Sequence, residues 1–143
     1  MTPQEELFAR AELRRLVERY ARSVDDRDAA AFADVFADDA VLITGRGEVR
    51  GREQLLAVPE RLERYRVTMH LVGNHDVQLA ADGVAASGWT YCIARHVYAV
   101  EDAERVSVMH IRYDDKFRRR PDGWRITERR LAVLWEEDHP LRS

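Results

Sequence analysis

The sequence predicts an α+β fold, with helices in the first part of the chain and an antiparallel meander of long strands after them. Between Phe8 and Val24, apolar residues recur at three- and four-residue spacing, which is typical of a helix with one buried face. From Tyr65 onward the period changes to that of strands. The segments 81–83, 101–104 and 121–123 interrupt the later part of the chain, and each is short enough for a hairpin connection. Helices first and hairpins afterwards are typical of the α+β class.

Length and composition indicate one globular domain over residues 1–143. A chain of this length buries enough surface for a core that contains a cavity. The chain is 45% hydrophobic and 34% charged, with a formal net charge of -3. That charge gives no electrostatic reason to expect nucleic acid or an acidic membrane surface as a partner.

The cysteine count and the N-terminal residues bear on the cellular compartment. Cys92 is alone, which excludes a disulfide within the chain and a cysteine-based zinc site. Residues 1–6 lack the basic start and apolar core of a signal peptide. No run of about 18 apolar residues occurs, so we expect no membrane span and a cytoplasmic protein.

The first helix has a clear start signal. Thr2 is placed to cap it, Pro3 suits the first helical position, and Glu5 completes a capping box. The helix is expected to end near Asp25. The residues predicted to face inward are Phe8, Leu13, Leu16, Val17, Tyr20 and Val24.

The next segment is expected to alternate short helices with a strand. Asp28 is a candidate cap for a second helix through Phe36, which the Asp38-Asp39 pair would end. Residues 40–44 are apolar and β-branched, which favours a first strand, and 45–47 would turn the chain.

A third helical piece is expected after Gly51. Pro59 would kink or divide it, because proline cannot donate a backbone hydrogen bond. Long strands should follow at about 66–79, 84–100, 105–119 and 124–135.

Polar side chains on the inner face of such a sheet are the candidates for chemistry. A curled antiparallel sheet with helices on its concave side forms a cone whose mouth can admit a small ligand. His70 lies within an apolar strand. His96 is a candidate on the next strand, although its place between Arg95 and Val97 leaves open that it faces solvent. His110 could belong to either face, and His75 and His139 are predicted at the surface.

Asp25 and His70 could form a proton-handling pair. An imidazole titrates near neutrality, and a carboxylate on its other nitrogen fixes the tautomer and stabilises the imidazolium. The two residues are 45 positions apart, so only the fold could join them. The residues alone leave other interpretations open: Asp25 as part of a polar connection, His70 as a core histidine, and Tyr20 as a core aromatic.

Other site classes lack their motifs. No glycine-rich loop follows a strand in the dinucleotide or P-loop pattern, and the nucleophile-elbow pattern is absent. No short histidine spacing supports a metal site. We therefore expect neither a metal nor an organic cofactor.

Five segments together resemble one known family. These segments are 20–28, 35–40, Gly51, 68–70 and 117–126. They resemble the polyketide-cyclase-like (SnoaL-type) branch of the NTF2-like superfamily over nearly the whole chain. The resemblance implies a cone of N-terminal helices packed on a strongly curved, mainly antiparallel sheet.

The resemblance also implies site residues. In the scytalone dehydratase-like branch an aspartate ends the first helix and a histidine lies on the first long strand, and Asp25 and His70 match both positions. His96 matches a second histidine of scytalone dehydratase, and Tyr20 matches a tyrosine of the bile acid 7α-dehydratase. Tyr20 also stands where the hexachlorocyclohexane dehydrochlorinase has a lysine, which argues against dehalogenation. Val24 replaces a pocket tyrosine of scytalone dehydratase.

The activity implied is that of a cofactor-independent dehydratase-like lyase acting on a small hydrophobic hydroxy-carbonyl substrate. His70, oriented by Asp25, would remove a proton, and His96 or Tyr20 would protonate the departing hydroxyl. The alternatives are an isomerase or polyketide/terpenoid cyclase with the same base, and a noncatalytic ligand-binding or oligomerisation module. The resemblance further implies a homodimer or homotrimer.

The sequence leaves open whether three further groups reach the pocket. These are His110, Tyr113 and the cluster Arg118–Arg120.

Overall fold

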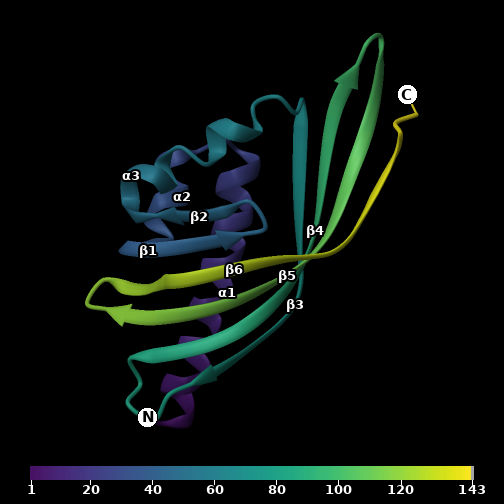
Figure 1. The fold of residues 1–143 in the computed structure, drawn as a ribbon. Helices are drawn as coiled ribbons and strands as arrows, with labels where there is room; N and C mark the ends of the chain where they lie inside the picture. The colour runs from purple at the N-terminus through teal and green to yellow at the C-terminus, as the bar shows by residue number, and fades with distance from the viewer. Residues whose placement is uncertain (143) are drawn as a thin grey trace.

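Helices and one sheet make up the protein, and the structure, a computed structural model, describes residues 1–142 (Figure 1). The helices are α1 (Pro3–Asp25), α2 (Ala29–Asp34), α3 (Gly51–Leu56) and the 3-10 turn η1 (Pro59–Leu62). The strands are β1 (Phe36–Thr44), β2 (Gly47–Arg50), β3 (Val67–Leu79), β4 (Ala85–Val100), β5 (Ala103–Arg120) and β6 (Gly123–Pro140).

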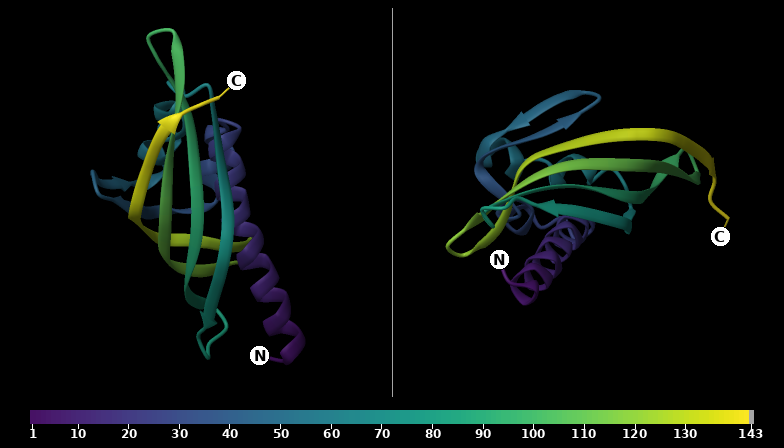
Figure 2. Two further views of the ribbon diagram at one scale, coloured as in Figure 1. Left: turned by 90° about the vertical axis from the view of Figure 1, so that its right-hand side faces the viewer. Right: turned by 90° about the horizontal axis from the view of Figure 1, so that it is seen from below.

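The sheet has the order β2-β1-β6-β5-β4-β3 and curves around α1 (Figures 1 and 2). Strands β3 to β6 form the predicted antiparallel meander, which confirms the α+β class and the curved, cone-like sheet. Two features were not predicted: the short strand β2, and the parallel pairing of β1 with β6. The parallel pair joins segments about 90 residues apart, so no local pattern marks it.

Helix α1 begins as predicted, with Thr2 and Glu5 in a reciprocal capping box. Its core-facing residues are also as expected, apart from Phe8, which is 67% exposed, so its inward assignment is wrong. At that level of the helix Ala9 is the buried residue. Phe8 is rotated away from it by one position, about 100° around the axis.

The boundary between α2 and β1 differs from the prediction. Asp28 caps α2 as expected, but the helix ends at Asp34, and Phe36 already belongs to the strand. Phe36 pairs with Ile126 of β6, and the register then shifts before Val41. Tertiary pairing therefore extends the strand backward through the Asp38-Asp39 segment, which was predicted only to end a helix.

Side chains of α1 protect one of the two edges of the sheet. Strand β3 is that edge, and Arg10 donates a hydrogen bond to the Val77 carbonyl while Arg14 donates one to the Gly73 carbonyl. Farther along α1, the Asp25 carboxylate accepts from the His70 backbone N–H. Unpaired edge groups are thus satisfied by the helix, which fixes the position of α1 against β3.

A β-bulge in β3 changes which residues face the interior. The register with β4 shifts between Val72 and His75. Residues 73–74 of β3 therefore lie opposite a single residue of β4, which is the pattern of a bulge. Beyond the bulge, His75 contacts the buried Thr90 hydroxyl at 2.9 Å, and Val77 is buried. The prediction that His75 lies at the surface is therefore wrong.

Candidate active site

Asp25 and His70 meet where the end of α1 lies against β3. The Asp25 Oδ1 atom is 2.7 Å from His70 Nδ1, and Oδ2 accepts from the His70 backbone N–H at 2.9 Å. The side chain of His70 is 7% exposed and that of Asp25 is 22% exposed. One carboxylate therefore binds both the backbone and the ring of the same histidine, which fixes the ring orientation.

A third donor completes the carboxylate's surroundings. The Thr68 hydroxyl, two residues before His70 on the same face of β3, donates to Asp25 Oδ1 at 2.9 Å. Burial raises the pKa of Asp25, but the hydrogen bonds from the His70 ring, the His70 backbone N–H and the Thr68 hydroxyl outweigh it and lower the pKa below its usual value. Asp25 is thus an anion at neutral pH.

The ionised carboxylate decides the tautomer of His70. A carboxylate can only accept, so the hydrogen-bond network assigns the ring proton to Nδ1 and leaves a lone pair on Nε2. Within residues 1–142 no protein group bonds that Nε2, and the atom is not sealed from solvent. Such a nitrogen can act as a general base.

His96 of β4 lies beside His70, with the ring centroids 5.8 Å apart and the rings nearly perpendicular. His96 is 4% exposed, and its Nδ1 lies 3.3 Å from the Ser107 carbonyl. Burial, followed by the neighbouring His70, lowers the pKa of His96 to about 4. His96 is therefore neutral at neutral pH.

Tyr20 occupies a different part of the interior. Its ring packs against Phe32, Phe36 and Tyr113, with the Arg129 guanidinium 4.2 Å from the ring centroid. Burial raises the pKa of Tyr20, so the hydroxyl keeps its proton. The structure brings Asp25, His70 and His96 together and places Tyr20 in this neighbouring aromatic cluster.

A buried ion pair supports that cluster and was missed by sequence reasoning. Arg129 of β6 donates to both oxygens of Asp115 of β5, at 2.7 and 2.9 Å, and the side chains are 1% and 0% exposed. The Arg129 guanidinium also lies 3.8 Å from the ring centroid of Tyr113.

The structure also places the three groups that the sequence left open. Tyr113 is inside, as just described. The His110 ring stacks on Trp135 at a centroid distance of 3.9 Å, on the sheet face turned away from α1. Arg118–Arg120 are exposed near the β5–β6 turn.

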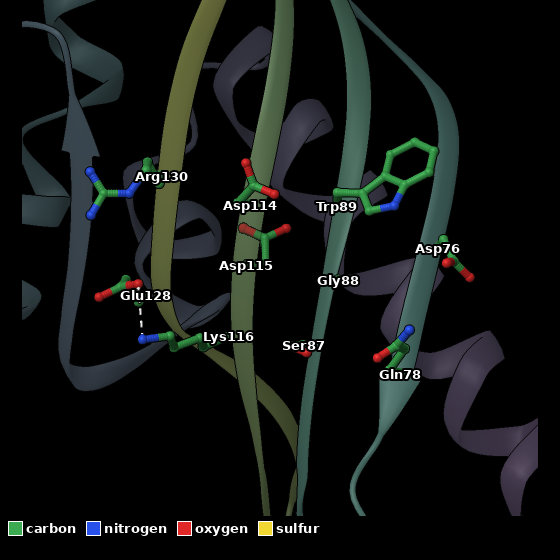
Figure 3. Close-up of a pocket in the computed structure, with 10 residues that line it drawn as sticks. All are labelled: Asp76, Gln78, Ser87, Gly88, Trp89, Asp114, Asp115, Lys116, Glu128 and Arg130. Atoms are coloured by element: carbon green, nitrogen blue, oxygen red, sulfur yellow. Dashed lines mark ion pairs between the residues drawn. The ribbon is translucent and has the colours of Figure 1, made fainter.

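The hollow in Figure 3 lies on the outer face of the sheet, over β3 to β6. It encloses about 370 Å³ and is lined by charged groups of both signs. Most of these charges already have partners: Lys116 pairs with Glu128 at 3.4 Å, and Asp114 with Arg112 at 3.1 Å. Neither this hollow nor four other surface hollows, at the N-terminus, at the end of α1, beside β1 and beside the β3–β4 turn, is lined by Asp25, His70 or His96.

Across residues 1–142, no three His, Cys, Asp or Glu side chains are grouped so that they could hold a metal ion. None of the helices there combines the length and apolar character required to cross a bilayer.

Comparison with known proteins gives a family and several relatives. The model of the SnoaL-like domain family matches residues 5–130. An uncharacterized protein of Mycobacterium tuberculosis (strain ATCC 25618 / H37Rv) is 32% identical over 127 residues, which cover 87% of this chain and 84% of the relative.

Solved structures share the fold. A proposed scytalone dehydratase from Novosphingobium aromaticivorans superposes with a TM-score of 0.85 at 18% identity, covering 99% of this chain and 95% of the other. A hexachlorocyclohexane dehydrochlorinase (LinA, type 2) gives a TM-score of 0.84 at 19% identity, covering 99% and 94%. At these identities the likeness concerns the fold.

Proposed function

This chain belongs to the SnoaL-like family, with an NTF2-like fold, and on that premise we propose that it is a cofactor-independent dehydratase-like lyase. The proposed substrate is a small hydrophobic hydroxy-carbonyl compound. The observation that carries the proposal is the 2.7 Å contact between Asp25 and His70 Nδ1, which leaves Nε2 as a positioned base. The dehydratase and dehydrochlorinase among the structural neighbours support an elimination reaction.

In the first step, His70 Nε2 takes a proton from the carbon next to the substrate carbonyl. The electron pair of that C–H bond moves toward the carbonyl, whose oxygen takes up the negative charge of an enolate. Asp25 stabilises the imidazolium that forms at His70. A positioned base of this kind contributes about 10²- to 10⁴-fold to the rate.

In the second step, the electron pair of the enolate forms the new C=C double bond, the C–O bond breaks, and the departing hydroxyl takes a proton and leaves as water. His96 and Tyr20 are the candidate donors, and they differ in protonation at neutral pH. His96, with a pKa of about 4, must first receive a proton, whereas Tyr20 already carries one. Protonation state thus favours Tyr20, and proximity to His70 favours His96.

The test is a panel of β-hydroxy ketones and hydroxylated cyclic ketones incubated with the protein. Products lighter by one water support the lyase. Products that keep the substrate mass in H₂O, and that gain deuterium when the incubation is repeated in D₂O, indicate the isomerase or cyclase alternative. The variant His70→Ala should lose turnover while keeping the fold, with the exposed His139→Ala as control. Full turnover in His70→Ala would reject His70 as the base.

We also propose that the protein is a homodimer or homotrimer that associates through the outer face of the sheet. Leu71 neighbours the inward His70 and so points outward, in one cross-strand row with Ile93, His110 and Trp135. Leu71 is 50% exposed and Trp135 54% exposed, which favours burial against another surface. Light scattering gives the oligomeric state, and Leu71→Asp should yield monomers.

A further inference from the structure

Arg27, two residues beyond the end of α1, has an unusual backbone conformation. Its φ angle is +56°, in the left-handed region that glycine and asparagine adopt most easily. The position directly after a helix C-cap is where glycine is most often found. A strained arginine at such a position indicates that its side chain has a role that glycine could not fulfil.

The Arg27 guanidinium is held in a fixed place by several acceptors. Nη1 donates to the Val24 carbonyl at 2.7 Å and to the Thr68 hydroxyl oxygen at 2.8 Å, and Nη2 donates to the Leu62 carbonyl at 3.0 Å. These contacts join the end of α1, the η1 turn and the start of β3.

The contact with Thr68 determines the direction of the next hydrogen bond. A guanidinium only donates, so Thr68 must accept from Arg27 and has its single proton left for another partner. That partner is Asp25 Oδ1, at 2.9 Å, and Thr68 is 4% exposed, so water hardly competes. The same Oδ1 receives the His70 Nδ1 proton at 2.7 Å.

We propose that Arg27 and Thr68 are positioning residues of the active site: Arg27 fixes the Thr68 hydroxyl as a donor to Asp25, which keeps Asp25 Oδ1 on His70 Nδ1. The relay Arg27, Thr68, Asp25, His70 then holds His70 in the tautomer whose Nε2 is unprotonated. In water the tautomer with its proton on Nε2 competes. The relay keeps the proton on Nδ1, so the lone pair of Nε2 stays available to accept a proton from the substrate. The inference rests on the proposed role of His70 as the base.

The first test compares Thr68→Val with Thr68→Ser, which differ in whether a hydroxyl remains. The ¹⁵N chemical shifts of the His70 ring report the tautomer, and the ¹³C shift of the Asp25 carboxyl reports its pKa. We expect Thr68→Ser to match the wild type. Thr68→Val should give a mixture of His70 tautomers and raise the pKa of Asp25 by about one unit, a tenfold change in its ionisation equilibrium.

The second test asks whether Arg27 acts through Thr68. Arg27→Gly suits the positive φ angle, so this variant should fold, and melting temperature checks that. Its tautomer mixture should lie between wild type and Thr68→Val. Adding Arg27→Gly to Thr68→Val should change the tautomer no further, because the intermediate hydroxyl is already gone. Additive effects of the two substitutions would overturn the relay.

These readouts separate the inference from the proposed function. If Thr68→Val and Thr68→Ser show the same His70 tautomer and Asp25 pKa, the positioning role is rejected, whatever the activity. If the relay holds in NMR but His70→Ala keeps full turnover, the proposed base fails and the relay stands as a structural unit. With a turned-over substrate, Thr68→Val should lower kcat about tenfold at unchanged KM, and Thr68→Ser should restore it.

Discussion

The interior of this protein contains two neighbouring polar clusters that differ in how their charges are paired. In the first, the Asp25 carboxylate binds a histidine and is 22% exposed, and His70 Nε2 has no partner among residues 1–142. In the second, both Asp115 oxygens are bound by Arg129, and neither side chain is more than 1% exposed.

The difference separates a group that can exchange protons from one that cannot. Arginine does not deprotonate in proteins, so Arg129 has no proton to exchange, and both oxygens of Asp115 already accept hydrogen bonds from it. An imidazole changes charge near neutrality and has a second nitrogen for a substrate. The sealed cluster is thus suited to holding the strands β5 and β6 together, and the histidine cluster to chemistry.

The largest expected effect on stability comes from breaking the sealed pair. Arg129→Met leaves the Asp115 carboxylate buried without a partner and should cost about 3 to 5 kcal/mol of unfolding free energy. Urea denaturation measures it, with the neighbouring exposed Arg130→Met as control. The double variant Arg129→Met with Asp115→Leu should recover most of the loss. A cost near zero for Arg129→Met alone would contradict the assignment of a structural role.

The histidine cluster should dominate the response to acid. The pKa of His96 falls from 6.5 to about 4 on folding, chiefly through burial, so between these values the unfolded chain binds a proton that the folded chain does not. The contribution of His96 to the free energy of unfolding is therefore at its full value above pH 6.5. It falls as the pH falls, and about 3 kcal/mol is lost at pH 4. Unfolding free energy measured against pH should lose this slope in His96→Phe and keep it in the exposed His139→Phe. An equal slope in both variants would remove His96 as the cause.

A smaller loss is expected when Asp25 becomes an amide. In Asp25→Asn an NH₂ group, which is a donor, replaces one carboxylate oxygen. The surrounding groups of Thr68 and His70 are donors too, so one of them would face another donor. One donor is left unsatisfied, at about 1 to 3 kcal/mol, and turnover should be lost because His70 loses its anion. Denaturation and turnover are compared with Asp26→Asn, an exposed neighbour. Unchanged turnover would place Asp25 with the structural residues.

The fold could be predicted largely because its signals are local. The turn segments at 81–83, 101–104 and 121–123 mark the hairpins, and the strands they connect lie within a few residues of the expected ranges, apart from the longer β6. His75 was misplaced because the bulge at 73–74 reverses the inward parity. The signal in the sequence was that inward apolar residues change from even positions, such as Val72, to odd positions, such as Val77.

The two clusters were not equally visible in the sequence. Asp25 and His70 were singled out by residue type, but 45 residues separate them, so only family resemblance supported their pairing. Asp115 and Arg129 lie on the two strands of one hairpin. Arg120 is opposite Gly123 at the turn, and a regular antiparallel register continued from that pair would place Asp115 opposite Glu128. A register shift between Lys116 and Phe117 brings Arg129 there instead. A one-residue bulge has no clear sequence mark here, so the buried ion pair could not be derived.

Substitution of Tyr20 should have the smallest effect on stability. Its effect on turnover decides whether Tyr20 belongs with the catalytic residues or with the structural cluster. Tyr20→Phe removes a hydroxyl while the ring still packs against Phe32 and Tyr113, so unfolding free energy should change by at most about 1 kcal/mol. If Tyr20 protonates the departing hydroxyl, turnover should fall by about 10²- to 10⁴-fold, with Tyr91→Phe, at a tyrosine that is 40% exposed, as the control. If His96 is the donor instead, Tyr20→Phe keeps its turnover, and activity declines as the pH rises above about 4. Full turnover in Tyr20→Phe would therefore place Tyr20 with the sealed structural cluster, because its one polar atom would then contribute nothing to proton transfer.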